Sequence, residues 1–490
     1  MEFVADLHLH SKYSRAVSPS MTLPVMAQYA MQKGIDILTA SDWTHPVWFK
    51  EIQGQLEEAG QGIYALKSEY RNPKSETNSP PKADQPLAGN DKNSNVQKEI
   101  LFVLSTEISS IYKQGDKLRR IHNLVFVPGI ETASKFNKEL LSRGCNLSAD
   151  GRPIIGLSSK NLLELLLSID ERAFLIPCHI WTPHFGIYGS ASGFDSLEEA
   201  FGDMAKYIYG IETGLSSDPD MNWQVKELMQ RSILSFSDAH SPAKMGREAT
   251  VFELAKASFE NIRKAIMRTS LNPPNPPLVK GGKGGFPRND RNKVAYTLEF
   301  YPEEGKYHFS GHRNCKYAAG PEELARTGNI CRICKRRLTE GVFFRVQQLS
   351  DETLLKRAEI KKNQLGLQWF TDKLHIQPPY IKLVPLLEVV AEAQGSTVAS
   401  QKTQAIYADL CTKLGGELEV LLRRKIAEIA KVAGERVAEG VEKVRSGDIV
   451  IKPGYDGEYG VVEIFGSAKQ NSERKGAVKK ISRGQLGLNL

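Results

Sequence analysis

The sequence predicts an α/β protein whose first part, residues 1–270, is a barrel-like sheet surrounded by helices. Short apolar runs recur through the first 240 residues, and helical patterns such as Leu162-Leu163-Leu165-Leu166 separate them. Continuous apolar runs of this length are typical of strands buried on both faces, as in the parallel sheets of β/α units. The carboxyl ends of such strands gather on one side of the sheet, so residues distant in the sequence meet there.

Each of six apolar runs leads into side chains that bind metals. The runs begin at residues 3, 35, 100, 174, 208 and 233, and they lead into Asp6, His8, His10, Asp42, Glu107, His179, Glu212, Asp238 and His240. A single histidine or aspartate after a strand is more often a cap or a surface residue. The His8-Leu9-His10 spacing is more specific, because alternate strand residues point to one side and aim both imidazoles at one ion. The whole series predicts a site with several metal ions.

The types of ligand indicate the chemistry. Mixed imidazole and carboxylate donors suit zinc, manganese or iron, and a carboxylate can bridge two ions. Ions a few ångströms apart clamp an in-line displacement at phosphorus and ionise the attacking water. We therefore expect phosphoester hydrolysis with two or three divalent ions (Zn, Mn, Mg or Fe) and no side-chain nucleophile.

The stretch Asp6-Leu7-His8-Leu9-His10 resembles the first motif of the polymerase and histidinol phosphatase (PHP) family of metal-dependent phosphoesterases, and Ser237-Asp238-Ala239-His240 resembles its last. The resemblance implies a distorted seven-stranded β/α barrel in which Glu107 bridges two ions. It implies catalytic roles for Asp42, Glu107 and Asp238. The implied metal ligands are His8, His10, Asp42, Glu107, His122, His179, Asp238 and His240. The family usually has histidine directly after the second-motif aspartate, whereas Trp43 follows Asp42 here, so the role of the nearby His45 stays open.

Four loops, at residues 41–46, 179–183, 214–219 and 246–250, are similar to the endonuclease Q family. The resemblance implies an enzyme that nicks DNA on the 5′ side of deaminated bases (uracil, hypoxanthine, xanthine) and of abasic sites, after the damaged nucleotide is extruded. It implies a base pocket lined by Gly214, Leu215, Ser216 and Ser217. Lys12, Tyr13 and Arg15 are candidates for holding the adjacent phosphate or filling the gap in the stack, and an ordinary surface role is equally open.

Composition and charge limit the cellular setting. The chain has 490 residues, 41% of them hydrophobic. No apolar stretch reaches the length of a membrane helix and no basic, hydrophobic leader precedes the first strand, so we expect a cytoplasmic, nucleoid-associated protein without a membrane partner. The net charge of +8 is localised, because residues 301–345 carry +4 and residues 467–490 carry +5. Such segments fit a polyanion such as DNA, although a solvated basic tail has the same composition.

Two segments interrupt the folded pattern. Residues 67–98 are rich in Asn, Ser, Pro, Lys and Asp, which predicts a disordered insertion within the barrel. Residues 271–293 combine proline runs with Gly-Gly-Lys-Gly-Gly, which predicts a flexible linker or insertion at the end of the barrel.

Residues 294–349 predict a small zinc-binding domain that opens with a strand at residues 296–301. Fifteen residues separate His312-x2-Cys315 from Cys331-x2-Cys334, and two knuckles at this spacing close a tetrahedral site. His308 is an alternative fourth ligand. Four protein ligands leave no position for water, so one structural zinc is expected. The surrounding basic residues, which can contact phosphates without reading sequence, are Arg313, Lys316, Arg332, Lys335, Arg336 and Arg337. The other cysteines, Cys145, Cys178 and Cys411, are expected to be packing residues.

Residues 350–466 predict a helical domain that ends in a hairpin. Stripes such as Leu386-Leu387-Val389-Val390 are typical of core-facing helix surfaces, and residues 448–465 alternate and turn like a hairpin. This part resembles C-terminal segments of proteins labelled as helicases. The chain nevertheless lacks Gly-x4-Gly-Lys-Ser/Thr, so no ATP-driven function is expected.

Residues 467–490 predict a basic flexible tail. Its end, Gln485-Leu486-Gly487-Leu488-Asn489-Leu490, resembles the motif by which bacterial repair and replication proteins bind the sliding clamp. The candidate contact residues are Gln485, Leu486, Leu488 and Leu490. An accidental match in a frayed terminus is the alternative.

Together these patterns predict a metal-dependent endodeoxyribonuclease of DNA repair that acts on double-stranded DNA with a damaged base. One alternative is another PHP phosphoesterase that acts on a small phosphate or trims DNA 3′ ends. The other is a non-catalytic DNA-binding scaffold. The sequence leaves open the ion used, the preferred lesion and the oligomeric state.

Overall fold

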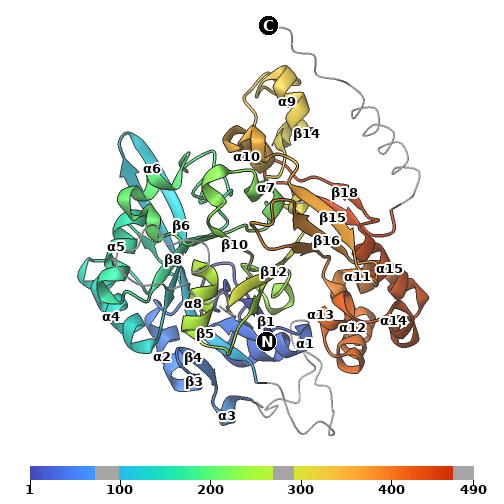
Figure 1. Cartoon of the computed structure of the whole chain (residues 1–490), viewed down its shortest axis with the longest axis horizontal. Coiled ribbons are helices and arrows are strands. Elements are labelled where there is room, and N and C mark those ends of the chain that lie inside the picture. The colour runs from blue at the N-terminus through green and yellow to red at the C-terminus, as the bar shows by residue number, and fades with distance from the viewer. Residues whose placement is uncertain (72–98, 269–291, 467–490) are drawn as a thin grey trace, which may run out of the picture.

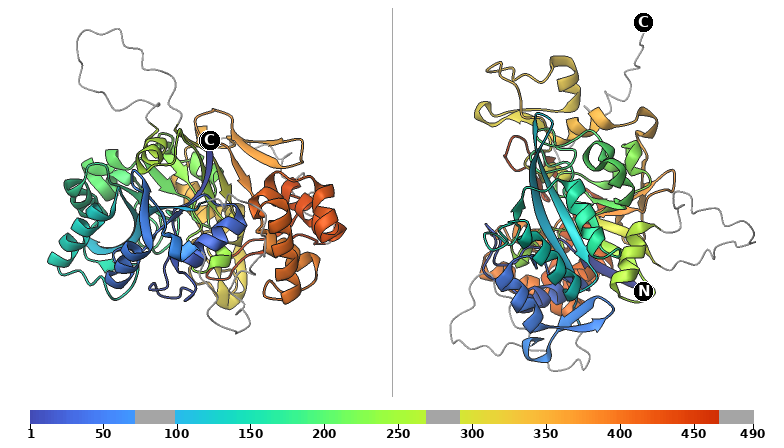
Figure 2. Two further views of the ribbon diagram at one scale, coloured as in Figure 1. Left: turned by 90° about the horizontal axis from the view of Figure 1, so that it is seen from below. Right: turned by 90° about the vertical axis from the view of Figure 1, so that its left-hand side faces the viewer.

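The computed structural model describes residues 1–71, 99–268 and 292–466 (Figure 1). Helices α2, α4, α5 and α6 lie on one side of the molecule, and helices α11 to α15 gather on the other (Figures 1 and 2). A large mixed sheet connects the two sides. The predicted α/β class is therefore confirmed at this level.

Each of the six apolar runs coincides with a strand of the structure. These strands are β1 (Glu2–Asp6), β2 (Ile37–Thr39), β5 (Leu101–Gln114), β8 (Phe174–Pro177), β9 (Gly210–Glu212) and β10 (Ser232–Leu234). β1 pairs in parallel with β2, β2 with β5, and β9 with β10. Neighbouring residues such as Ile37 and Leu38 enter different core clusters, so both faces of these strands are buried. This burial explains why the runs are apolar throughout.

The expectation of parallel strands alone is wrong at β6 (Lys117–Val127), which pairs antiparallel with both β5 and β8. β5 and β6 form a long hairpin whose turn contains Gly115 at φ +59°, a left-handed conformation that glycine adopts without steric cost. Because β6 reverses the direction once, β8 again runs the same way as β5. β6 brings His122 into the protein interior.

The segments that follow β1 and β10 are linked by a parallel bridge between Leu9 and Ala239. The backbone N–H of Thr213, after β9, also donates to the carbonyl of Leu234 in β10. These contacts gather the ends of β1, β9 and β10 at one place. The number of strands in a closed barrel stays a prediction.

Helices cover the outer side of these strands. α5 (Ser159–Ile169) buries the four leucines of the predicted stripe, and the Ser158 hydroxyl caps it by accepting the Asn161 N–H. The other helices of this part are α1 (Leu23–Lys33), α2 (Pro46–Gln55), α3 (Ser68–Arg71), α4 (Ile130–Ser142), α6 (Leu197–Phe201), α7 (Pro219–Trp223) and α8 (Phe259–Met267). The prediction of a disordered insertion from residue 67 is wrong at its start, because residues 68–71 form α3. The rest of that segment, residues 72–98, lies outside the described residues.

The sheet continues from β1 toward the C-terminal half. The added strands are, in spatial order, β11 (Ala249–Glu253), β12 (Lys293–Glu299), β17 (Tyr380–Lys382), β16 (Gln368–Asp372) and β15 (Ala358–Lys362). β12 is the strand predicted at residues 296–301, and it begins at Lys293, inside the predicted linker 271–293. Most of that linker lies outside the described residues. The helical pattern predicted from residue 350 is wrong between residues 358 and 382, because β17 is completed by parallel pairing with the remote β12.

The helices of the C-terminal part begin only at Leu386. They are α11 (Leu386–Ala393), α12 (Gln401–Leu414), α13 (Glu417–Leu422), α14 (Ile426–Ala433) and α15 (Glu435–Ser446). The predicted terminal hairpin is confirmed, since β18 (Val450–Lys452) pairs antiparallel with β19 (Val461–Glu463). The predicted tail 467–490, with its clamp motif, lies outside the described residues.

A small segment projects from the rest of the molecule (Figures 1 and 2). It contains β13 (Ser310–His312), β14 (Tyr317–Ala319) and α9 (Pro321–Thr327), and α10 (Val342–Leu349) follows it. The short strands β3 (Leu56–Gly60), β4 (Ile63–Leu66) and β7 (Ile154–Ile155) extend the sheet beside β5. Within the described ranges, no helix has the length and apolar character needed to cross a bilayer.

Candidate metal centre

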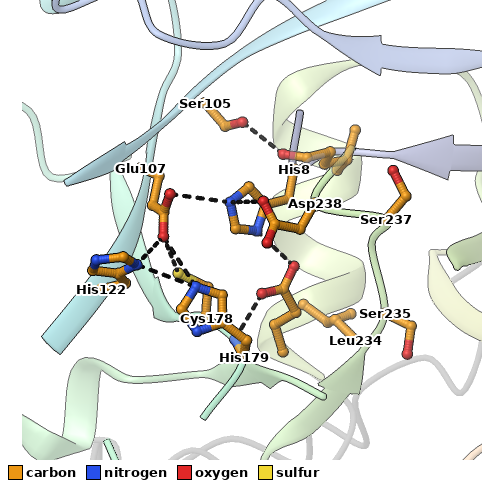
Figure 3. A network of polar contacts seen from close by, with 12 residues as sticks. His8, Ser105, Glu107, His122, Cys178, His179, Leu234, Ser235, Ser237 and Asp238 are labelled. Atoms are coloured by element: carbon orange, nitrogen blue, oxygen red, sulfur yellow. Dashed lines mark hydrogen bonds and ion pairs between the residues drawn. The ribbon is translucent and has the colours of Figure 1, made fainter. Parts of the chain in front are cut away.

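Residues from five separate parts of the chain converge on one cluster (Figure 3). His8 and His10 follow β1, Glu107 lies in β5, His122 in β6, His179 follows β8 and Asp238 follows β10. The side chains of His8, His10 and Glu107 are fully buried, whereas Asp238 is 27% exposed. The cluster is therefore open to solvent on the side of Asp238.

The first group of potential ligands consists of His8, His10, Glu107 and Asp238, whose donor atoms lie within 4.8 Å of one another. His10 Nε2 lies 3.2 Å from Glu107 Oε2 and 3.0 Å from Asp238 Oδ1. His8 Nε2 lies 3.7 Å from each of the same two oxygens. The His-x-His pair thus faces one position, as its spacing predicts.

The second group lies on the other side of Glu107. His179 Nε2 is 3.0 Å from Glu107 Oε1, and His122 Nδ1 contacts the same oxygen. Cys178 Sγ lies 3.6 Å from it. Glu107 therefore points one oxygen at each group, which is the geometry of a carboxylate that bridges two ions.

Asp42 lies behind His10. Its Oδ1 is 3.3 Å from His10 Nδ1, and its Oδ2 accepts the Ser11 N–H at 2.6 Å and the Ser14 hydroxyl at 2.8 Å. A carboxylate at the far nitrogen of an imidazole fixes the orientation of the ring and its tautomer. Asp42 is outside the ligand groups formed by the described residues, so the structure places it in an orienting position.

The remaining predicted histidines lie at the edge of the cluster. The His240 ring centroid is 4.7 Å from that of His10, and its Nδ1 is 2.9 Å from the Asp238 carbonyl. His45 Nδ1 instead accepts the Trp48 N–H and caps α2, while Tyr13 stacks on its ring at 4.5 Å. His45 thus serves as a helix cap and joins neither ligand group.

Three further neighbours of the cluster were not among the predicted metal ligands. Glu212 accepts from His8 Nδ1 at 2.8 Å and from the His179 N–H at 2.8 Å, so it orients both groups. The sequence indicated Glu212 only as a metal-type side chain at the end of an apolar run. Arg152 Nη1 lies 3.1 Å from Glu107 Oε2, but its irregular loop carries no motif. Cys178, expected to be a packing residue, is buried and also contacts Glu107.

Burial and the local charges set the protonation of the cluster. Burial alone would lower the pKa of His8 and of His10, but the carboxylates around them raise both well above the ordinary value. For His122 burial prevails and lowers the pKa to about 4, so this imidazole is neutral at pH 7. Although burial opposes it, the positive charge of Arg152 and the hydrogen bonds from His10 and His122 lower the pKa of Glu107. The cluster thus holds ionised carboxylates in a low-dielectric interior, where they favour a cation.

The backbone at the cluster is strained. Asp42, His179 and Asp238 adopt φ values of +54°, +31° and +47°, a region that residues with a Cβ rarely occupy. Such strain persists where the surrounding structure enforces it, and it concentrates at functional sites. Gly214 approaches His179 so closely that an added Cβ would lie 2.4 Å from the His179 Cβ.

We therefore expect Gly214→Ala to displace His179 and to slow the phosphoester hydrolysis predicted from the sequence about 100-fold, because a shift of about 1 Å at a reacting site can have that effect. Gly144→Ala is the matched control, since Gly144 also has a positive φ, +77°, but has no atom within 4 Å of its added Cβ. Cleavage rates and metal content of the two variants measure the difference. Equal rates would show that the close approach is unimportant.

Among the predicted lesion-binding residues, Gly214 packs against His179 of the second group. Ser217 is buried and donates to the Thr213 carbonyl at 2.9 Å, while the next residue, Asp218, pairs with Lys382 at 2.6 Å. The segment that contains Gly214, Leu215, Ser216 and Ser217 is therefore held between His179 and Lys382. Near His10, Lys12 pairs with Glu51 at 3.0 Å, Tyr13 donates to Glu51 at 2.7 Å, and Arg15 is 78% exposed.

A second cluster of potential ligands lies in the projecting segment. The donor atoms of His312, Cys315, Cys331 and Cys334 lie within 4.8 Å of one another. His308 is buried against Phe309 and Phe343 and is not part of this group, which resolves the alternative in favour of His312. Backbone N–H groups of Cys334 and Ile333 outweigh the effect of burial and lower the pKa of Cys331 to about 6, so its thiolate is available at pH 7. One histidine and three cysteines suit zinc.

Comparisons with known proteins found a matching domain model and relatives of similar sequence. A model of the "MJ0043 C-terminal domain" matches residues 385–448. The uncharacterised protein YqxK of Bacillus subtilis is 29% identical over 94% of this chain and 98% of its own length. The uncharacterised protein MJ0043 of Methanocaldococcus jannaschii is 29% identical over 58% of this chain, which spans only 31% of that protein.

Two solved structures are similar over nearly the whole chain. The lesion-specific endonuclease PfuEndoQ of Pyrococcus furiosus is 26% identical, with a TM-score of 0.71 over 97% of this chain and 99% of its own. Endonuclease Q, in complex with a 27-mer duplex that carries an abasic lesion at the active site, is 27% identical, with a TM-score of 0.72 over 95% of this chain and 98% of its own.

Proposed function

We propose that this protein is a DNA repair endonuclease of the endonuclease Q type, which nicks the phosphodiester bond 5′ to uracil, hypoxanthine, xanthine or an abasic site. The observation that carries the proposal is the position of Glu107 between two imidazole groups, in a chain similar over 95% of its length to a nuclease solved with lesion DNA at its active site. Its setting would be the nucleoid of the cytoplasm.

We propose the PHP barrel as the scaffold. The seven strands would be β1, β2, β5, β6, β8, β9 and β10, and the Leu9–Ala239 bridge supports their closure. The division of the chain into barrel, zinc-binding and helical domains belongs to the same proposal.

The donor set fits divalent cations, because imidazole and carboxylate oxygens suit zinc, manganese and iron. His8, His10, Glu107 and Asp238 would hold one ion, and Glu107, His122 and His179 a second, with His240 at the edge. When bound, such ions supply an activated water and stabilise the leaving oxygen. Asp42 keeps His10 in place through Nδ1, and Glu212 does the same for His8. The cysteine cluster would bind one structural zinc.

Recognition of the lesion begins with extrusion of the nucleotide, which costs least for a mispaired or absent base. Gly214 packs against His179. It begins the segment Gly214, Leu215, Ser216 and Ser217, which would receive the flipped base beside the scissile phosphate. The exposed basic residues Lys335 and Arg336 of the zinc segment would contact phosphates of the duplex.

A labelled duplex with one hypoxanthine, incubated with Mn²⁺ or Mg²⁺, tests the proposal. A single nick on the 5′ side of the lesion is expected, and an undamaged duplex should stay intact. Trimming of 3′ ends would identify another phosphoesterase, and binding without product would identify a scaffold. Either result would overturn the proposal.

Metal affinity should depend on pH. The raised pKa values of His8 and His10 favour protons which an ion must displace, so we expect the affinity for Mn²⁺ to fall as the pH drops from 8 to 6, by up to about tenfold per pH unit for each of the two protons. In the protein without metal, the free energy of unfolding depends on pH in the opposite direction. A raised pKa stabilises the fold at low pH, and this stability is lost as the pH rises. Calorimetry in buffers of different ionisation enthalpy measures the protons released. An affinity independent of pH would contradict the assignment.

The clamp motif makes a separate prediction. A chain that lacks residues 485–490 should no longer be retained on an immobilised sliding clamp, while it nicks lesion DNA at the normal rate. Retention equal to that of the full chain would rule out Gln485, Leu486, Leu488 and Leu490 as clamp contacts.

A further inference from the structure

We propose that Arg152 binds the scissile phosphate of the substrate and stabilises the charge that develops there. The proposal rests on the proposed function, because it assigns a residue to the same site. It concerns a side chain that no motif of the sequence indicates.

The loop that carries Arg152 is fixed against the cluster. The Gly151 N–H donates to the Tyr13 carbonyl at 3.1 Å, and the Thr44 hydroxyl donates to the Gly151 carbonyl at 3.3 Å. An added Cβ at Gly151 would lie 2.5 Å from Asp42 Oδ2, so the loop passes in direct contact with the residue that orients His10. The Arg152 N–H donates to Asp150 Oδ1 at 3.2 Å. The guanidinium is thus presented from a well-supported backbone.

The guanidinium itself is only partly used. Its Nη1 donates to Glu107 Oε2 at 3.1 Å, and the side chain is 24% exposed. Nε and Nη2 form no hydrogen bond with any described residue, and neither is fully enclosed by protein. A paired N–H edge directed at solvent matches two oxygens of a phosphate.

No other lysine or arginine of residues 1–71, 99–268 and 292–466 forms an ion pair with Glu107, Asp42 or Asp238. Arg247 uses Nε and Nη2 on the Ser237 carbonyl, and Lys12 pairs with Glu51. Arg152 is therefore the fixed positive group placed at this cluster.

The contact between Arg152 and Glu107 also explains how the guanidinium becomes free to bind a phosphate. Glu107 Oε2 faces His8, His10 and Asp238, the residues that would hold a cation, and a bound cation would compete with Arg152 for this carboxylate. The guanidinium then keeps its place at the open side of the cluster and exchanges a carboxylate oxygen for a phosphate oxygen. A donor already in position when charge develops stabilises the transition state without reorganisation.

Arg152→Gln, Arg152→Lys and the control Arg143→Gln test the assignment. Arg143 is exposed on the connection before the same loop, and within the described ranges its ion pair is with Glu139. With Mn²⁺-loaded protein and abasic-site duplex, we expect Arg152→Gln to lower the single-turnover nicking rate about 100-fold and Arg152→Lys to restore part of it. Orthophosphate should bind the Mn²⁺-loaded Arg152→Gln variant about tenfold more weakly, as judged by calorimetry. Metal content and melting temperature should match the wild type, and Arg143→Gln should behave as wild type throughout.

The results separate this inference from the proposed function. If the wild type leaves lesion DNA intact, the proposed function fails, and orthophosphate binding still decides the role of Arg152. Unchanged phosphate binding, or an unchanged nicking rate where the wild type nicks, overturns the assignment. Loss of metal or of thermal stability in Arg152→Gln would also overturn it, because Arg152 would then be a structural counter-ion of Glu107.

Discussion

Glu107→Gln is expected to lower the nicking rate at least about 1,000-fold, the effect of losing several kcal/mol of metal-assisted stabilisation. The reason is geometric, because Oε2 of this side chain faces His10 and Oε1 faces His179. A neutral amide bridges two cations poorly, so both ligand groups weaken together. Single-turnover nicking of abasic-site duplex and metal content by mass spectrometry measure the two effects.

Glu139→Gln is the matched control, since Glu139 is partly exposed on α4 and pairs with Arg143. It should leave the rate and the metal content unchanged. The bridging role of Glu107 would be refuted by a Glu107→Gln protein that retains full metal content and nicks within tenfold of the wild-type rate.

Cys331→Ser is expected to remove the structural zinc and to unfold the projecting segment. Only a small core supports it, formed by Ala319, Leu324, Cys331 and Leu338. Structural zinc contributes about 10 kcal/mol to small domains of this kind, which exceeds what such a core supplies. Zinc content should fall by one equivalent, residues 310–340 should become sensitive to protease, and affinity for duplex DNA should drop.

Cys145→Ser is the control, because Cys145 is only partly buried and lies outside both ligand clusters. It should keep its zinc and its resistance to protease. If Cys331→Ser also keeps the zinc and a folded segment, the cluster of His312 and the three cysteines is not a structural metal site.

Strands of the N-terminal half were predictable where burial on both faces leaves a local signal, a run of apolar residues. Runs such as residues 174–176 are apolar because both faces of β8 are covered, and this signal needs no knowledge of the partner strand. β6 escaped prediction because it is the second arm of a hairpin with a mixed sequence. β15 to β17 escaped because β17 depends on β12, about 80 residues away.

The metal-binding residue types were predictable in the same way, since His8, His10 and Asp238 directly follow apolar runs. The placement of His122 came only from the family resemblance, because its strand was not recognised. Asp42 and His45 show the limit of such reasoning. Both stand in a motif, yet one orients His10 and the other caps α2.

The sequence by itself determined which residues could bind metal ions and roughly where the strands end. Apolar runs and ligand spacing are local properties of the chain. Only the tertiary structure decided which oxygen of Glu107 faces which imidazole, and that Arg152 joins them. Those relations depend on the pairing of β5 with β6 and on the path of an irregular loop over Asp42. Contacts between residues so far apart in the chain have no periodic signature and arise only when the folded backbone brings them together.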